Sequence, residues 1–156
     1  MVDKSEKQEA REAAYRLISY RDRSESELKK RLLDKGNSIE VIEAIIPRIK
    51  ELGYLDDRRF AEKWVRHKVK HSPKGSYFLY KELEEKGVAK KIINEVLKEE
   101  YPYGLEYENA LKLAKKWRNK SRNKDKEIVK LKVYLKNKGF NYEIISNVVD
   151  DIVVDS

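Results

Sequence analysis

The chain has 156 residues, 41% of them charged and 40% hydrophobic, and its 36 Lys and Arg outnumber its 28 Asp and Glu by eight. This apolar content is too high for a disordered chain. The chain has no cysteine, which excludes disulfides and thiolate zinc sites and leads us to expect a cytoplasmic protein. No apolar run reaches the roughly 18 residues that a membrane span needs, so we expect no membrane contact. Six glycines and three prolines predict helices with short connections rather than a turn-rich β fold.

The first third of the chain predicts helices separated by short turns. Residues 1–8 are polar, and we expect them to form a flexible tail. Ser24 is followed three positions later by Glu27, the capping-box pattern in which a hydroxyl and a carboxylate satisfy free amides at a helix start. Residues 38–52 carry apolar side chains at helical spacing, and Pro47 inside this pattern predicts a kink in the helix rather than its end.

The middle of the chain predicts two further helix starts. Asp56 precedes an apolar periodicity that includes Phe60 and Val65, and we expect it to be an N-cap. Ser72 is expected to cap the next helix, with Pro73 at the first helical position, where a missing amide hydrogen is tolerated. No stretch of the sequence alternates convincingly enough to predict a strand.

Three glycines reveal an internal repeat. Gly36, Gly87 and Gly139 lie 51 and 52 residues apart, each directly after a lysine. Leucines stand eight and four residues before each glycine, and aliphatic side chains stand five, six, nine and ten residues after it. The matched positions are Leu28, Leu32, Val41, Ile42, Ile45 and Ile46, then Leu79, Leu83, Ile92, Ile93, Val96 and Leu97, then Leu131, Leu135, Ile144, Ile145, Val148 and Val149.

The repeat predicts an all-α fold of three tandem three-helix repeats, spanning residues 9–53, 54–102 and 103–156. A unit of about 50 residues has a small core, and neighbouring units in a tandem array complete burial for each other. We therefore expect an elongated, curved array that is a monomer, with a compact nine-helix bundle as the alternative. Function would then reside in surface shape and charge rather than in a deep pocket.

Positive charge is concentrated in two stretches, each with eight bases and one acid: the first basic segment, residues 58–81, and the second basic segment, residues 112–126. Such segregation indicates a polyanionic partner or an acidic protein surface, although a solvated lysine-rich surface is the alternative. The bases expected to contact a partner or DNA are Arg66, Lys70, Lys74, Lys116, Arg118, Lys120, Arg122 and Lys124.

Residue patterns typical of catalysis are mostly missing from the sequence. No glycine-rich phosphate loop and no cysteine nucleophile are present. His67 and His71 share a helix face, but Lys68 stands where a metalloprotease helix carries its glutamate. We therefore expect no metal, no cofactor and no enzymatic activity. Trp64 and Trp117 fall on apolar stripes and are expected in the core, whereas tyrosines such as Tyr77, beside bases, have no clear assignment.

Three stretches resemble the RecX family of bacterial recombination regulators: RDRSESELKKRLLDKG at 21–36, IKELGYLDDRRFAEKWV at 49–65 and LYKELEEKGV at 79–88. The similarity extends over about residues 10–152 and is loosest in the third repeat. It implies tandem three-helix units and no catalytic site. It also implies binding to the RecA filament on single-stranded DNA, with modulation, mostly inhibition, of the RecA recombinase, ATPase and co-protease activities in DNA repair and the SOS response.

Two other functions remain open at the level of sequence. One is a helical module that binds DNA directly without RecA, by weak phosphate contacts, because the segments after the repeat glycines are too apolar to read base edges. The other is a protein-interaction scaffold unrelated to DNA. Whether binding to single-stranded DNA requires RecA separates these possibilities.

Overall fold

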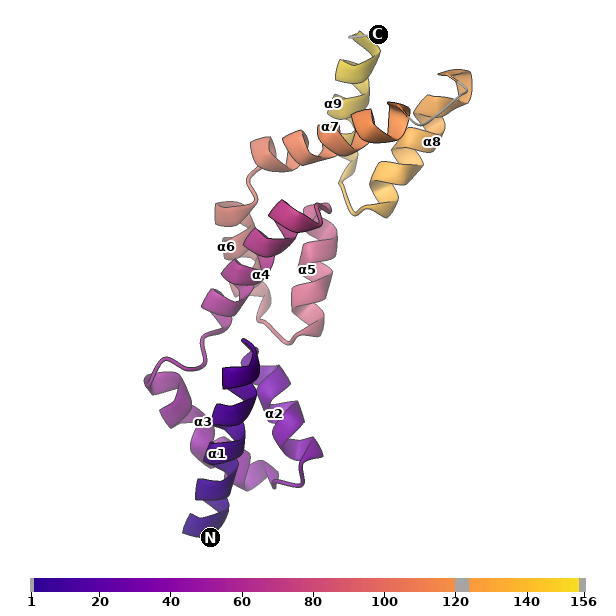
Figure 1. The fold of residues 1–156 in the computed structure, drawn as a ribbon. Helices are drawn as coiled ribbons and strands as arrows, with labels where there is room; N and C mark the ends of the chain where they lie inside the picture. The colour runs from indigo at the N-terminus through magenta and orange to yellow at the C-terminus, as the bar shows by residue number, and fades with distance from the viewer. Residues whose placement is uncertain (1, 120–123, 155–156) are drawn as a thin grey trace. The chain divides into compact units, whose positions relative to one another are not determined.

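The computed structural model describes the backbone of residues 2–119 and 124–154 and the side chains of 2–119 and 127–154, and in this part of the chain all regular elements are helices (Figure 1). The nine described helices are α1 (Lys4–Tyr20), α2 (Glu25–Asp34), α3 (Ile39–Glu51), α4 (Asp57–His71), α5 (Ser76–Glu85), α6 (Lys90–Glu100), α7 (Tyr103–Asn119), α8 (Lys124–Asn137) and α9 (Tyr142–Val154). The chain divides into two compact units, Met1–Ala61 with Leu83–Ile93 and Glu62–Glu82 with Asn94–Ser156.

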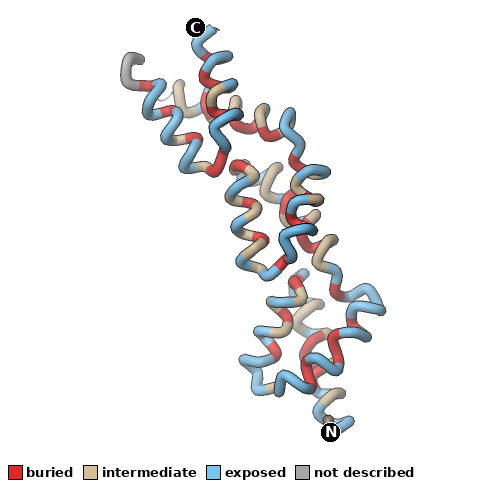
Figure 2. The backbone as a smooth tube through the Cα atoms, turned by 180° about the vertical axis from the view of Figure 1, so that it is seen from behind, coloured by how far each residue is buried: buried red, intermediate tan, exposed pale blue. Residues whose placement is uncertain are grey.

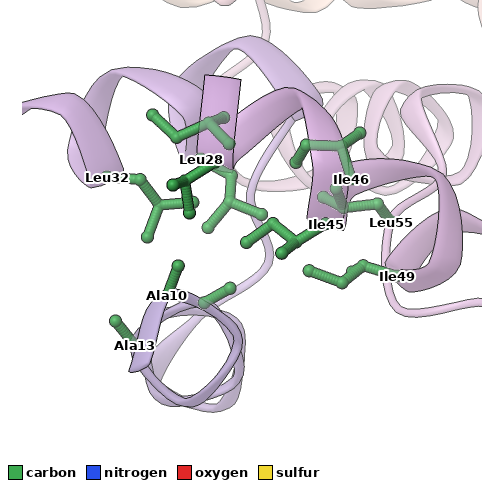
Figure 3. Close-up of a cluster of buried hydrophobic side chains, with 11 residues drawn as sticks. Ala10, Ala13, Leu28, Leu32, Ile45, Ile46, Ile49 and Leu55 are labelled. Atoms are coloured by element: carbon green, nitrogen blue, oxygen red, sulfur yellow. The ribbon is translucent and has the colours of Figure 1, made fainter. Parts of the chain in front are cut away.

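The core of the first unit lies between α1, α2 and α3. Small side chains such as Ala10 on α1 let the helices approach closely, and Leu28 and Leu32 of α2 meet Ile45 and Ile49 of α3 (Figure 3). These five residues are at most 1% exposed. The apolar stripes expected from the sequence therefore close one hydrophobic cluster among three helices.

Helix α1 begins earlier than the sequence indicates. The Asp3 side chain accepts a hydrogen bond from the Ser5 amide at 3.2 Å, so Asp3 is an N-cap and the helix starts at Lys4. Val2 packs against the core of the first repeat. The helix thus begins inside the segment 1–8 that the sequence analysis treats as a flexible tail.

The third repeat has its own core among α7, α8 and α9. Ala110 and Ala114 of α7 pack with Leu135 of α8 and with Ile144 and Val148 of α9. All five are fully buried, as Leu79, Leu83, Ile93 and Val96 are in the middle repeat. Figure 2 shows buried positions recurring along the helices of each repeat, and the register deduced from the three glycines is confirmed.

The helix ends follow the expected chemistry in most places. Ser24 and Glu27 form the capping box, with Ser24 Oγ accepting from the Glu27 amide at 3.1 Å and Glu27 Oε1 accepting from the Ser24 amide at 3.2 Å. Asp56 accepts from the Arg59 amide at 3.0 Å and is the expected N-cap. The turns after α2, α5 and α8 each place the repeat glycine at positive φ, between 80° and 98°, where a side chain would be strained.

The first junction between repeats joins the start of α2 to the second repeat. Ser24 Oγ donates a hydrogen bond to the Lys86 carbonyl at 2.6 Å, and the Glu25 amide donates to Asp57 Oδ1 at 2.8 Å. A Cβ atom on Gly87 would lie 2.3 Å from the Ser26 side chain. The N-terminus of α2 therefore docks on the Lys-Gly turn of the second repeat.

The second junction repeats this arrangement at the start of α5. The Gly75 amide donates to the Lys138 carbonyl at 2.7 Å, and the Ser76 amide donates to Glu106 Oε2 at 2.7 Å. A Cβ atom on Gly75 would lie 2.0 Å from the Gly139 backbone. In both places a middle helix is capped by a carboxylate from the first helix of the next repeat and rests on its Lys-Gly turn.

The expected start of α5 at Ser72 and Pro73 is wrong. The helix begins at Ser76, and the Gly75 carbonyl accepts its first hydrogen bond, from the Phe78 amide at 3.1 Å. The preceding segment is held outside the helix because the Tyr101 hydroxyl donates to the Lys74 carbonyl at 2.7 Å. The Tyr101 contact and the docking contacts of the third repeat together decide where the helix starts, whereas the local sequence shows only the proline.

The core predicts a sharp contrast between two adjacent leucines of α2. Leu32 is fully buried, so Leu32→Ala should lower the free energy of unfolding by about 2–5 kcal/mol through lost burial and a residual cavity. Leu33 is 45% exposed, and Leu33→Ala should change it by less than about 1 kcal/mol. Urea unfolding of both variants measures the difference, and equal losses would show that the register of α2 is wrong.

Candidate interaction surfaces

The first basic segment lies along α4 and into the start of α5, and ion pairs offset part of its charge. Arg66 on α4 bonds Glu100 at 2.7 Å and Glu62 at 3.2 Å. The hydrogen bonds that Arg66 donates to Glu100 lower the pKa of the Glu100 carboxyl. Of the three bases expected here to contact a partner, Arg66 thus already has two carboxylate partners within the chain.

Lys74 is also paired, whereas Lys70 is exposed. The Lys74 ammonium lies 3.2 Å from Glu82 Oε1, and the other oxygen of Glu82 accepts from the Trp64 indole at 2.8 Å. Lys70 forms no ion pair with any carboxylate that the structure describes. The charge of this segment in space is therefore smaller than its composition indicates, with Lys70 as the available base among the three.

The second basic segment presents an exposed basic face on the last turns of α7. Lys112, Lys115 and Lys116 are all exposed, and none of them pairs with a carboxylate in the described part of the chain. Arg118 points inward, 3.6 Å from the buried Glu127 carboxylate and 3.3 Å from the Ile152 carbonyl. Lys120 and Arg122 lie outside the described residues, as does the side chain of Lys124.

Lys112 and Lys115 are candidate contact residues that sequence reasoning did not single out. Lys115 and Lys116 follow Lys112 at the i+3 and i+4 positions of α7, so the three side chains lie on one face of the helix. Helical spacing alone would have grouped them. We refer to Lys112, Lys115 and Lys116 as the α7 basic face.

The aromatic residues near the basic segments are only partly buried. Trp64 carries the Lys68 ammonium 5.1 Å from its ring centre, and Trp117 stacks on Tyr134 with centroids 5.9 Å apart. The two tryptophans therefore lie at the edge of the core rather than inside it. Tyr77 remains 57% exposed, with the Lys81 ammonium 5.6 Å from its ring centre.

Neither a metal site nor a membrane helix is found in the described residues. The rings of His67 and His71 lie 4.6 Å apart, but within the described chain they are not joined by a third ligand of the kind a metal needs. In the same residues no helix is both long and apolar enough to cross a bilayer.

Two acids that cap helices at the junctions were not recognised from the sequence. Glu106 is 4% exposed and Asp57 is half-buried. Burial raises the pKa of both carboxyls, and the hydrogen bonds from the Ser76 and Glu25 amides oppose this shift only in part. No local motif marks them, because each acts on a helix of the preceding repeat.

Three family models match the chain in order. They are the first, second and third three-helix domains of RecX, at residues 10–48, 56–97 and 105–149. A protein named Regulatory protein RecX, from Pelodictyon phaeoclathratiforme, is 37% identical over 134 residues, which cover 86% of this chain and 82% of that protein. The chain belongs to the RecX family.

Other RecX relatives and a crystal structure match most of this chain. The RecX of Prosthecochloris aestuarii is 32% identical and covers 94% of this chain and 97% of its own length, whereas the chain spans 58% of the RecX of Oceanobacillus iheyensis, at 36% identity. The crystal structure of RecX from Lactobacillus salivarius matches with a TM-score of 0.89 and 26% identity, over 96% of this chain and 98% of that one. The names of these relatives describe regulators.

Glu106 predicts a specific pH dependence of stability. A carboxyl whose pKa is raised on folding contributes stability that is fully present below its unfolded pKa and is lost as the pH rises through the folded pKa. Glu106→Gln keeps a carbonyl acceptor for the Ser76 amide and cannot ionise. The stability of the parent relative to this variant should therefore fall as the pH rises above the ordinary glutamate pKa, as measured by urea unfolding at a series of pH values.

Glu108 provides the control for this measurement, because it lies on the same helix and is exposed. The parent and Glu108→Gln should keep a nearly constant difference over the same range. A parent that gains stability relative to Glu106→Gln as the pH rises would contradict a buried, desolvated carboxylate at the second junction.

Proposed function

We propose that the chain regulates recombination by binding the RecA filament on single-stranded DNA and lowering its ATPase, strand-exchange and co-protease activities. The observation that carries this proposal is the match to all three RecX domains in order, along most of the chain. The protein then acts by binding and not by catalysis, in the DNA repair and SOS responses of the cell.

The exposed lysines support a polyanionic or acidic target. The α7 basic face presents three ammonium groups that pair with no carboxylate among the described residues, and Lys70 adds a fourth on α4. Groups held in ion pairs, such as Arg66 with Glu100, have already exchanged part of their hydration for a carboxylate and contribute less to a new partner. Among the described residues, we therefore assign the attraction mainly to Lys70 and the α7 basic face.

Inhibition of RecA tests this proposal. The parent, titrated into RecA hydrolysing ATP on single-stranded DNA, should inhibit hydrolysis. The triple variant Lys112→Glu, Lys115→Glu, Lys116→Glu should need about tenfold more protein for half inhibition, which corresponds to roughly 1.4 kcal/mol of binding free energy. Added salt should weaken the parent more than the triple variant, because fewer charges remain to be screened.

A matched variant keeps the change in net charge constant. Lys90→Glu, Lys91→Glu, Lys98→Glu reverses three exposed lysines of α6 outside both basic segments and should inhibit nearly as well as the parent. If both triple variants lose inhibition equally, the effect depends on net charge alone and not on the α7 basic face. A parent that binds single-stranded DNA but leaves RecA unaffected would contradict the proposal in favour of a direct DNA-binding module.

A further inference from the structure

The second junction carries an apolar groove between α5, α8 and the start of α9, and all the residues that line it belong to the second unit. Its volume is about 590 Å³, and its walls include Phe78, Val133, Phe140 and Ile145. Val133 is 52% exposed and Tyr142, at the rim, is 82% exposed. Contiguous exposed apolar surface of this kind marks interaction sites in soluble proteins.

The first junction shows that the repeat does not require such a groove. It makes comparable contacts, with the Ser24 hydroxyl in place of the Gly75 amide. Yet the hollow beside it is lined by charged side chains, among them Arg21, Glu27, Lys30 and Lys86. In the repeat register, Glu27 of the first junction corresponds to Phe78 of the second. The apolar lining is therefore a property of the second junction alone and is not needed to join two repeats.

The rim of the groove is basic. Lys132 and Lys136 line it from successive turns of α8, and the Lys81 ammonium lies over the Tyr77 ring at its edge. None of the eleven residues that line it is acidic. An occupant that matches this surface has apolar groups at its centre and carboxylates at its margins.

The lining favours apolar side chains over nucleobases. Apart from the lysines and the tyrosine hydroxyls, polar groups come from Asn141 and Ser146, and Asn141 Oδ1 already accepts the Ile144 amide at 2.9 Å as the cap of α9. A base placed between Val133 and Ile145 would bury its hydrogen-bonding edge without enough partners. Leucine-like side chains leave nothing unsatisfied, and an amphipathic helix supplies them at the spacing that a groove between helices accepts.

We propose that this groove docks an amphipathic helix of a protein partner, with apolar side chains in the groove and carboxylates against Lys132 and Lys136. The site stands apart from the proposed function, since it invokes neither RecA nor DNA. It also differs in place from the α7 basic face, since no residue of α7 lines the groove.

A designed peptide tests the groove directly. The acidic probe is a helix of about four turns with leucines on one face and glutamates beside them. The basic probe is the same peptide with lysines in place of the glutamates. Amide NMR of the isotope-labelled full chain should show shifts centred on Gly139, Phe140 and Ile145. The acidic probe should bind at least about tenfold more tightly than the basic one, equivalent to roughly 1.4 kcal/mol.

Two valines of α8 supply matched variants. Val133→Glu places a charge in the groove and should weaken the acidic probe at least about tenfold, again roughly 1.4 kcal/mol. Val129 is 70% exposed on the same helix and does not line the groove, so Val129→Glu should leave the affinity within about twofold, the scatter expected of a surface change. Equal effects of the two substitutions would overturn the proposal.

Other occupants give distinct results. Absence of shifts with the acidic probe, or equal binding of both probes, would overturn the proposal. A short oligo(dT) could instead change the amide chemical shifts of the groove residues more than the peptide does. If these changes are lost in Val133→Glu, the groove is a nucleic-acid site and the proposal is wrong. Dimerisation of the parent in sedimentation, abolished by Val133→Glu, would identify a second copy of this chain as the occupant and would equally overturn it.

Discussion

The starts of α2 and α5 depend on the repeat that follows each of them. The first amides of a helix have no partner within the helix, and burying them unsatisfied is costly. At Glu25 and Ser76 the partner is a carboxylate from the next repeat, and the Lys-Gly turn of that repeat closes against the same helix end. At these two points, helix capping and contact with the next repeat are therefore one interaction, which fixes where α5 begins.

Because backbone atoms, two acids and the Ser24 hydroxyl make these contacts, the other side chains around them are free to differ. The first junction surrounds its contact with ion pairs, such as Glu27 with Lys86 at 3.2 Å. The second surrounds the equivalent contact with Phe78 and Val133. A duplicated scaffold has thus acquired different surfaces at its two junctions, while the α7 basic face provides a third kind of surface on a helix that takes no part in the groove.

Periodicity and glycine spacing were sufficient to predict the helices, the repeat and the core. The six equivalent positions Leu32, Ile42, Leu83, Ile93, Leu135 and Ile145 are all at most 6% exposed. The sequence could not show that Arg66 and Lys74 are paired, because Glu100 and Glu82 meet them only through folding. It also could not show Glu106 or the groove, since both arise where residues of different repeats come together.

Gly75 offers the most direct test of docking between repeats. An added Cβ would lie 2.0 Å from the Gly139 backbone, so Gly75→Ala should lower the free energy of unfolding by about 1–3 kcal/mol through overpacking. Gly104 lies in α7 with open space around it, and Gly104→Ala should be neutral or stabilise by up to about 1 kcal/mol. Urea unfolding of both variants decides the matter: the account predicts opposite or clearly unequal effects, and a Gly75→Ala variant as stable as Gly104→Ala would contradict it.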